Sequence, residues 1–92
     1  MSQHQLAKLK NRLAAWREKN PLRKWRKKHD WTQAEAANFT DLSTQSIRNF
    51  ESGGFAPNDA SLEAMSALLG LTTEQLKEVW KRWTNKRPKQ SM

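Results

Sequence analysis

The chain has 92 residues, which is enough for one domain with a modest core. It contains no cysteine, which excludes a disulfide framework and a thiolate metal site and favours an intracellular setting. It has neither an apolar run long enough to span a bilayer nor a secretory signal in residues 1–10, so the sequence predicts a cytoplasmic protein without a membrane segment. No metal or cofactor is expected, because His4 and His29 alone do not make a metal site.

The net charge of +8 is unevenly distributed along the chain. Residues 1–29 carry +9, residues 30–79 carry −6 and residues 80–92 carry +5. Basic flanks favour a polyanionic partner, because Lys and Arg release counterions when they neutralise phosphates. A solvated charged surface is the alternative when charge is considered alone.

Capping residues and hydrophobic periodicity predict an all-α fold of six helices, since no run of alternating β-branched residues indicates a strand. The first helix is expected over about residues 2–19, with basic side chains around an apolar stripe made of Leu6, Leu9, Leu13 and Trp16. Asn20 as the cap and Pro21 at the first helical position then begin a second helix, which runs to about residue 28.

The later helices also begin at polar caps. Thr32 opens a T-x-x-E capping box before a short helix over residues 33–39, and Ser43 caps the helix that follows. Another helix runs from about residue 57 to its end at Gly70, and Thr72 begins the last one. This last helix carries a second apolar stripe, made of Leu76, Val79, Trp80 and Trp83.

Three parts are therefore expected. They are a basic amphipathic helix over residues 1–19, a compact domain of about five helices over residues 20–84, and a basic flexible tail over residues 85–92. The two apolar stripes are expected to pack either on each other within one chain or on a second chain. Packing in a core is the expected role of the tryptophans, ahead of stacking on bases.

The turn after residues 33–39 is short, because only Thr40, Asp41 and Leu42 separate this helix from the one that Ser43 caps. Two short helices joined so tightly tend to cross at a steep angle, which lets one lie across a DNA backbone while the next enters the major groove. The sequence therefore predicts a helix-turn-helix unit over residues 31–53, with the recognition helix over residues 43–51.

At about 100° per residue, one face of this recognition helix carries four polar side chains. They belong to Thr44, Gln45, Arg48 and Asn49. The Gln and Asn amides can bind adenine, Arg can bind guanine, and the Thr methyl can contact the thymine methyl. An ordinary solvent-exposed face is the alternative, since any surface helix directs polar residues outward.

The segments TQAEAA at 32–37, LSTQSI at 42–47 and FESG at 50–53 resemble the lambda repressor and Cro family, also called the xenobiotic-response-element family. The resemblance covers about residues 20–76 and implies a compact helix-turn-helix domain that binds double-stranded DNA, commonly as a homodimer. It implies that Thr44, Gln45 and Asn49 read bases with Arg48 beside them. It also implies that Gln33 contacts phosphate, and that Glu51 is structural and pairs with Arg26.

The sequence departs from the family pattern at Asp41, where a glycine often makes the turn, and at Ala36, which replaces a larger aliphatic residue. The loop over residues 52–59 also lacks Lys and Arg. Phosphate contacts are therefore expected mainly from the second helix and from polar groups around the motif. The expected set is Arg23, Lys24, Lys27, Lys28, Gln33, Ser43, Gly53 and Gly54.

The function expected from these features is a sequence-specific transcriptional repressor or autoregulator that binds a pseudo-palindromic operator as a dimer, in the nucleoid of a bacterial or phage-infected cell. One alternative is an antitoxin whose apolar stripe covers a protein partner while the domain binds its own promoter. Another is an adaptor that binds nucleic acid through charge alone. An enzyme is not expected, because no nucleophile-and-base motif or phosphate-cradling loop is present.

Overall fold

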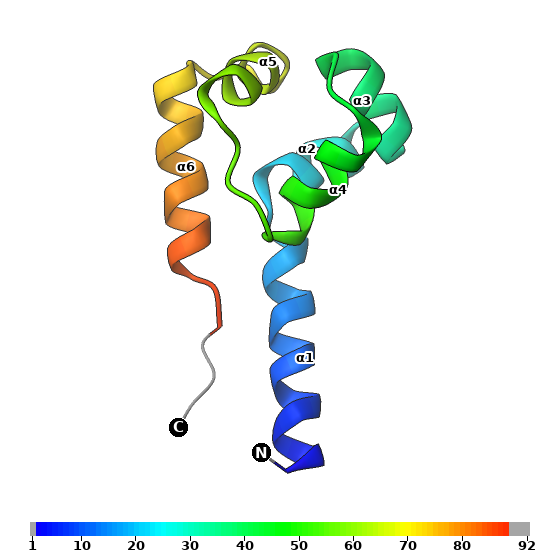
Figure 1. Ribbon diagram of the computed structural model, residues 1–92, viewed down its shortest axis with the longest axis vertical. Coiled ribbons are helices and arrows are strands. Elements are labelled where there is room, and N and C mark those ends of the chain that lie inside the picture. Colours follow the sequence, from blue (N-terminus) through cyan, green and yellow to red (C-terminus); the bar gives the residue numbers. More distant parts are fainter. Residues whose placement is uncertain (1, 89–92) are drawn as a thin grey trace.

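The computed structural model describes residues 2–88, which form six helices and no strand (Figure 1). In chain order these are α1 (Gln3–Glu18), α2 (Pro21–Lys28), α3 (Gln33–Thr40), α4 (Thr44–Ser52), α5 (Asp59–Leu69) and α6 (Thr73–Asn85). The all-α class is confirmed. Asn85, the expected first residue of the tail, belongs to α6, and residues 89–92 of that tail lie outside the described part of the chain.

Every one of these helices begins at a polar cap whose side chain accepts a hydrogen bond from a backbone N–H in the first turn. Ser2, Thr32 and Thr72 form complete capping boxes. The other caps are Asn20, Ser43 and Asn58. The helix starts are therefore determined by short local patterns, which explains why the expected caps Asn20, Thr32, Ser43 and Thr72 are present, while α5 begins at Asp59, slightly later than the expected start near residue 57.

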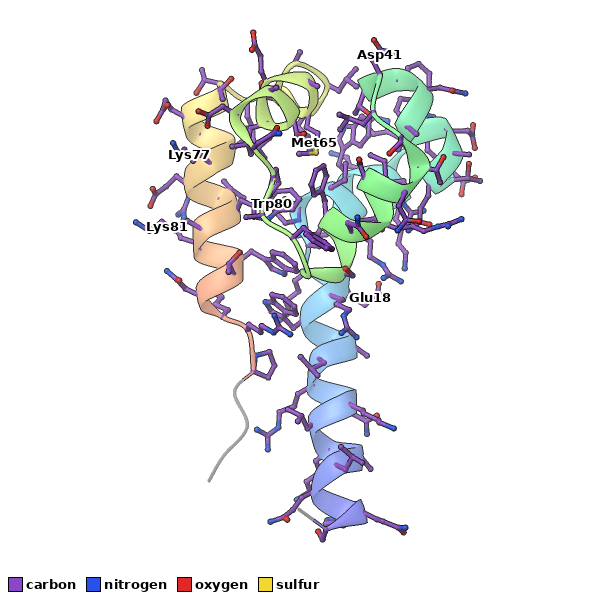
Figure 2. The ribbon with its side chains drawn as sticks, viewed as in Figure 1. Glu18, Asp41, Met65, Lys77, Trp80 and Lys81 are labelled. Carbon is purple, nitrogen blue, oxygen red and sulfur yellow. The ribbon has the colours of Figure 1, made fainter. Side chains whose placement is uncertain are left out.

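The turn between α3 and α4 contains Asp41 in the left-handed conformation, with φ of 60°. Asp tolerates this conformation at some cost, in place of the glycine that is more usual there. The backbone N–H of Leu42 donates to the carbonyl of Ala37, which closes the turn. Figure 2 shows Asp41 at the outer end of α3.

The core is assembled from all six helices, and Leu22, Ile47, Met65 and Leu76 are completely buried in it. Ala36 is also buried, whereas Phe39 is 55% exposed and stacks on Trp31 at the surface. Three of the five tryptophans are core residues, namely Trp16, Trp80 and Trp83.

Helix α1 projects from the domain and meets it only at its C-terminal end (Figure 1). There the rings of Trp16 and Trp83 stack with centroids 4.0 Å apart and planes 1° from parallel. Each indole N–H donates to the other residue's backbone carbonyl, at 2.8 and 2.9 Å. The two apolar stripes thus meet within one chain at this pair, while Leu6 at the far end of α1 remains 43% exposed.

Candidate nucleic-acid interface

Helices α3 and α4 form a closely packed pair in which α4 buries one face and exposes the other. Ile47 is completely buried and Phe50 nearly so, and both belong to the core cluster. Gln45 and Arg48 are exposed, whereas Thr44 and Asn49 are half-buried. The four side chains expected to read bases therefore share the side of α4 that faces away from the core.

Two of these side chains contact each other. The Gln45 amide nitrogen Nε2 donates to Asn49 Oδ1 at 3.1 Å, one helical turn away. This bond orients both amides and leaves the Gln45 carbonyl oxygen and the Asn49 amino group available on the exposed face. The pair can therefore present an acceptor and a donor together, the combination that the edge of adenine requires.

A buried ion pair fixes the inner side of α4. Arg26 on α2 donates from Nε to Glu51 Oε2 at 2.8 Å and from Nη2 to Oε1 at 2.9 Å. Its Nη1 donates to the Trp31 carbonyl at 2.9 Å. Glu51 is only 2% exposed, and its hydrogen bond raises the pKa of Arg26. The pair implied by the resemblance is present, and it removes the carboxylate of α4 from the face that would meet phosphate.

The C-terminal end of α4 is held by the junction of α1 and α2, a contact that no sequence pattern predicts. Arg17 Nε donates to the Ser52 carbonyl at 3.2 Å, and Asn20 Nδ2 donates to the Phe50 carbonyl at 3.0 Å. The Trp16 ring lies against Gly53, where a Cβ would collide with it. Arg17 and Asn20 look from the sequence like a surface cation and a helix cap, and no local pattern indicates these distant partners.

Gln33 and Ser43 lie at the N-terminal ends of α3 and α4. Gln33 is the first residue of α3 and is half-buried. The hydroxyl of Ser43 accepts from the Ser46 N–H at 3.0 Å and donates to Ser46 Oγ at 2.9 Å. Both residues are therefore close to the free backbone N–H groups of a helix start, which favour an anion.

Gly53 and Gly54 follow α4, and the backbone N–H of each forms a hydrogen bond within the chain. Gly53 ends the helix in the left-handed conformation, with φ of 78°, and its N–H donates to the Phe50 carbonyl at 3.4 Å. The N–H of Gly54 donates to Ser52 Oγ at 3.3 Å. Both amides expected to approach phosphate are thus engaged within the chain.

The four cations of α2 that are expected at phosphate fall into two groups. Arg23 and Lys27 each lie 2.8 Å from an oxygen of Glu18, and the Lys27 hydrogen bond is the main reason that the pKa of Glu18 is lowered. Lys24 and Lys28 are exposed and form no ion pair within residues 2–88. Lys24, Lys27 and Lys28 line one shallow surface together with Glu18, and Lys24 also lines a hollow beside α1 and α6, so three of the four cations lie near one another.

A comparison with protein families decides the identity of this domain. Residues 22–76 match the family model described as helix-turn-helix. The chain belongs to this family. No curated protein and no solved structure matches the chain.

Membership in the helix-turn-helix family, of the lambda repressor and Cro type, makes the chain a DNA-binding transcriptional regulator. The matched segment extends from the core residue Leu22 on α2 to Leu76 on α6, so it contains the Arg26–Glu51 pair and all of α3 and α4. The family is one of regulatory DNA-binding domains and not of enzymes. Over the part of the chain that the structure describes, no helix has both the length and the apolar character needed to cross a membrane.

Proposed function

We propose that this regulator is a repressor or autoregulator that binds a pseudo-palindromic operator as a dimer, in the cytoplasm of a bacterial or phage-infected cell. The observation that carries this proposal is the outward face of α4, where Gln45 and Asn49 are joined by a hydrogen bond and Arg48 is exposed beside them. With α4 in the major groove, this face meets base edges. Thr44, at the start of the helix, adds a methyl group that can contact the methyl group of thymine.

The rigid attachment of α4 supports base reading, because specificity requires that the amides keep their positions when DNA binds. The Arg26–Glu51 pair holds α4 from α2, and the Arg17 and Asn20 hydrogen bonds hold its C-terminal end. A recognition helix held at its side and at its end loses little conformational freedom on binding.

We assign phosphate contacts to Gln33, Ser43 and Lys28, with Lys24, Lys27 and Arg23 contributing to the positive field. Gln33 and Ser43 occupy helix starts, and Lys28 is an exposed cation without a carboxylate partner in the described chain. Gly53 and Gly54 are not included, because their amides already donate within the chain.

Of the two apolar stripes, only the one on α1 remains available for a dimer. Leu76, Trp80 and Trp83 on α6 are buried in the domain, whereas Leu6 is 43% exposed. We therefore place the dimer contact on the N-terminal half of α1. A foreign protein on the same stripe, as an antitoxin would require, is the competing arrangement.

Selection of bound sites from random duplexes tests the proposal. A palindromic consensus is expected, with Gln45→Ala and Asn49→Ala each weakening binding to it by about 1 to 3 kcal/mol and relaxing base choice at one position of each half-site. Glu78→Ala, an exposed change on α6, is the control and should leave binding unchanged. Equal losses on selected and random DNA would contradict base reading by α4, and a consensus without symmetry would contradict the dimer.

A further inference from the structure

A hollow open to solvent lies where the end of α1, the start of α2 and the last turns of α6 come together, and its volume is about 610 Å³. Its lining includes the buried side chains of Trp16 and Trp83 and the half-buried Val79. Exposed cations surround them, contributed by Arg12, Lys19, Lys24, Arg82 and Lys86. No residue of α3 or α4 lines the hollow, so it is separate from the base-reading face of α4, and Lys24 is the one lining residue that we also assign to the positive field around DNA.

The positive charge of this hollow is not neutralised by neighbouring acids. Its lining contains no Asp or Glu, and none of its five cations has an ion-pair partner among residues 2–88. Two acids adjoin lining residues in the sequence: Glu18 is held through both oxygens by Arg23 and Lys27, and Glu78, which precedes Val79, is exposed and is not part of the lining. Cations around a low-dielectric concave surface concentrate the positive potential there and attract anions.

We propose that this hollow binds a small organic anion, with a carboxylate or phosphate group at the Lys and Arg side chains and a flat apolar body against Val79 and the edges of the Trp16–Trp83 pair. The volume lies within the range of about 300 to 1,000 Å³ that is usual for small-molecule sites. An inorganic anion would leave the apolar surface of the hollow exposed to water. A duplex backbone offers phosphates on a convex surface and no apolar body to cover that surface.

A ligand in this hollow touches the same tryptophan pair that contacts the recognition helix. The Trp16 ring lies against Gly53, the C-cap of α4, and the ring of Trp83, stacked on Trp16, lies 3.2 Å from the position of a Cβ at Gly53. Arg17, the next residue on α1, donates to the Ser52 carbonyl. A ligand that shifts Trp16 therefore shifts the end of α4, and the anion acts as an effector of operator binding. This second step rests on the proposed function.

The binding site is tested on the full chain with 2-naphthyl phosphate, which combines a flat ring with a dianion. We expect one molecule to bind, with the largest NMR shifts at the indole N–H groups of Trp16 and Trp83 and in the last turns of α6. Inorganic phosphate has only the anionic group and 2-naphthol only the flat ring, so each should bind at least about tenfold more weakly than 2-naphthyl phosphate. Equal affinity for inorganic phosphate, or shifts centred on another surface, would overturn the proposal.

A matched pair of double variants separates the hollow from general charge. Arg82→Gln with Lys86→Gln removes two cations of the hollow, and Lys77→Gln with Lys81→Gln removes two from the same helix outside it. Figure 2 shows Lys77 and Lys81 on the side of α6 that faces away from α1. The first pair should weaken 2-naphthyl phosphate binding about tenfold and the second less than about twofold. Equal weakening by the two double variants would show that the probe responds to overall charge and would overturn the site. Displacement of the probe by random-sequence duplex would show that these cations bind nucleic acid, and it would also overturn the site.

The effector step is tested by measuring affinity for the selected operator with and without saturating 2-naphthyl phosphate. A change of about fivefold or more is expected, and it should disappear in the Arg82→Gln, Lys86→Gln variant. Unchanged affinity overturns the regulation while the NMR result still establishes the site. If no operator is found, the proposed function fails and the effector step fails with it, whereas binding of the probe, which needs no DNA, still stands.

Discussion

Glu51 is a buried carboxylate on the helix that we propose reads DNA, and Arg26 stabilises it through two parallel hydrogen bonds. Such a pair adds little net stability compared with apolar packing, because both ions lose their hydration. Removal of one partner is costly, since the other charge stays buried without compensation. The pair therefore makes the position of α4 depend on α2.

Arg26→Ala should lower the free energy of unfolding by roughly 3 to 5 kcal/mol, because it leaves the Glu51 carboxylate buried and unpaired. Arg26→Lys should also destabilise, since an ammonium cannot reproduce the two parallel bonds. Urea denaturation followed by circular dichroism gives both values. Arg48→Ala is the control, an exposed change that should stay within about 0.5 kcal/mol. A loss for Arg26→Ala no larger than this control would show that the pair does not hold the helix.

The acid Glu18 has a pKa below its usual value, first through the hydrogen bond from Lys27 and further through the charges of Arg23, Lys27 and Arg26, while desolvation opposes this lowering. Lys27→Gln should therefore raise the pKa of Glu18, as carbon-detected NMR of its carboxyl group would show. Because the folded-state pKa is depressed, the stabilisation is present above the unfolded value of about 4.3 and is lost as the pH falls through the folded pKa. Lys28→Gln, which removes a cation without a hydrogen bond to Glu18, should change this pKa much less.

A structural feature of the helices can be predicted from the sequence when the residues that determine it lie close together in the chain. The start of each helix follows from a cap within the first turn, as at Thr32 with Glu35, so local patterns suffice. The outward direction of Gln45 and Arg48 follows from helical spacing in the same way. Their contact with bases remains a prediction.

The contacts around the end of α4 could not be predicted, because their partners lie far apart and follow no repeating pattern. Arg17 reaches Ser52 over 35 residues, and Asn20 reaches Phe50 over 30. A cation and a capping residue in those places have many possible partners, and only the packed helices select among them. Glu18 is a different case, because its partners Arg23 and Lys27 are near in the sequence but lie on the next helix, so the pairing, which occupies two of the cations expected at phosphate, depends on how α1 and α2 are joined.

Helix α1 leads to a prediction about the assembly. Leu6→Glu should convert the dimer that we propose to a monomer, because it places a charge in the apolar stripe assigned to the contact, and it should leave the fold intact because Leu6 is outside the core cluster. Sedimentation equilibrium measures the change. Asn11→Glu adds the same charge on the opposite face of α1 and should leave the dimer unchanged. A dimer that persists in Leu6→Glu would place the contact elsewhere.

For the molecule as a whole, charge and base reading are assigned to different surfaces. Arg48 is the only Lys or Arg within α4, whereas residues 1–29 carry +9. The affinity for DNA should therefore come largely from the earlier helices, and the choice of sequence from α4. This division predicts that substitutions on α2 and on α4 affect the salt dependence of DNA binding differently.

Lys28→Ala should weaken binding to selected and random duplexes alike and reduce the slope of log affinity against log salt by about 1. Gln45→Ala should leave that slope unchanged. Fluorescence anisotropy titrations at several salt concentrations measure both, and Lys81→Ala provides a control at an exposed lysine of α6. A slope reduced equally by Lys81→Ala would show that general charge, and not contact by α2, determines the salt dependence.

The Trp16–Trp83 pair also has a consequence for the order of folding. Its residues are 67 positions apart, and the segment between them contains the whole helix-turn-helix unit. Closing so long a loop costs more conformational entropy than forming any turn or cap inside it, so the capped helices and the α3–α4 turn should form first and the pair last. The end of α4 then acquires its contacts with α1 in the final step. In native-state hydrogen exchange, the amides around Gly53 should therefore open together with the indole N–H groups of Trp16 and Trp83, before the core amides near Ile47 open.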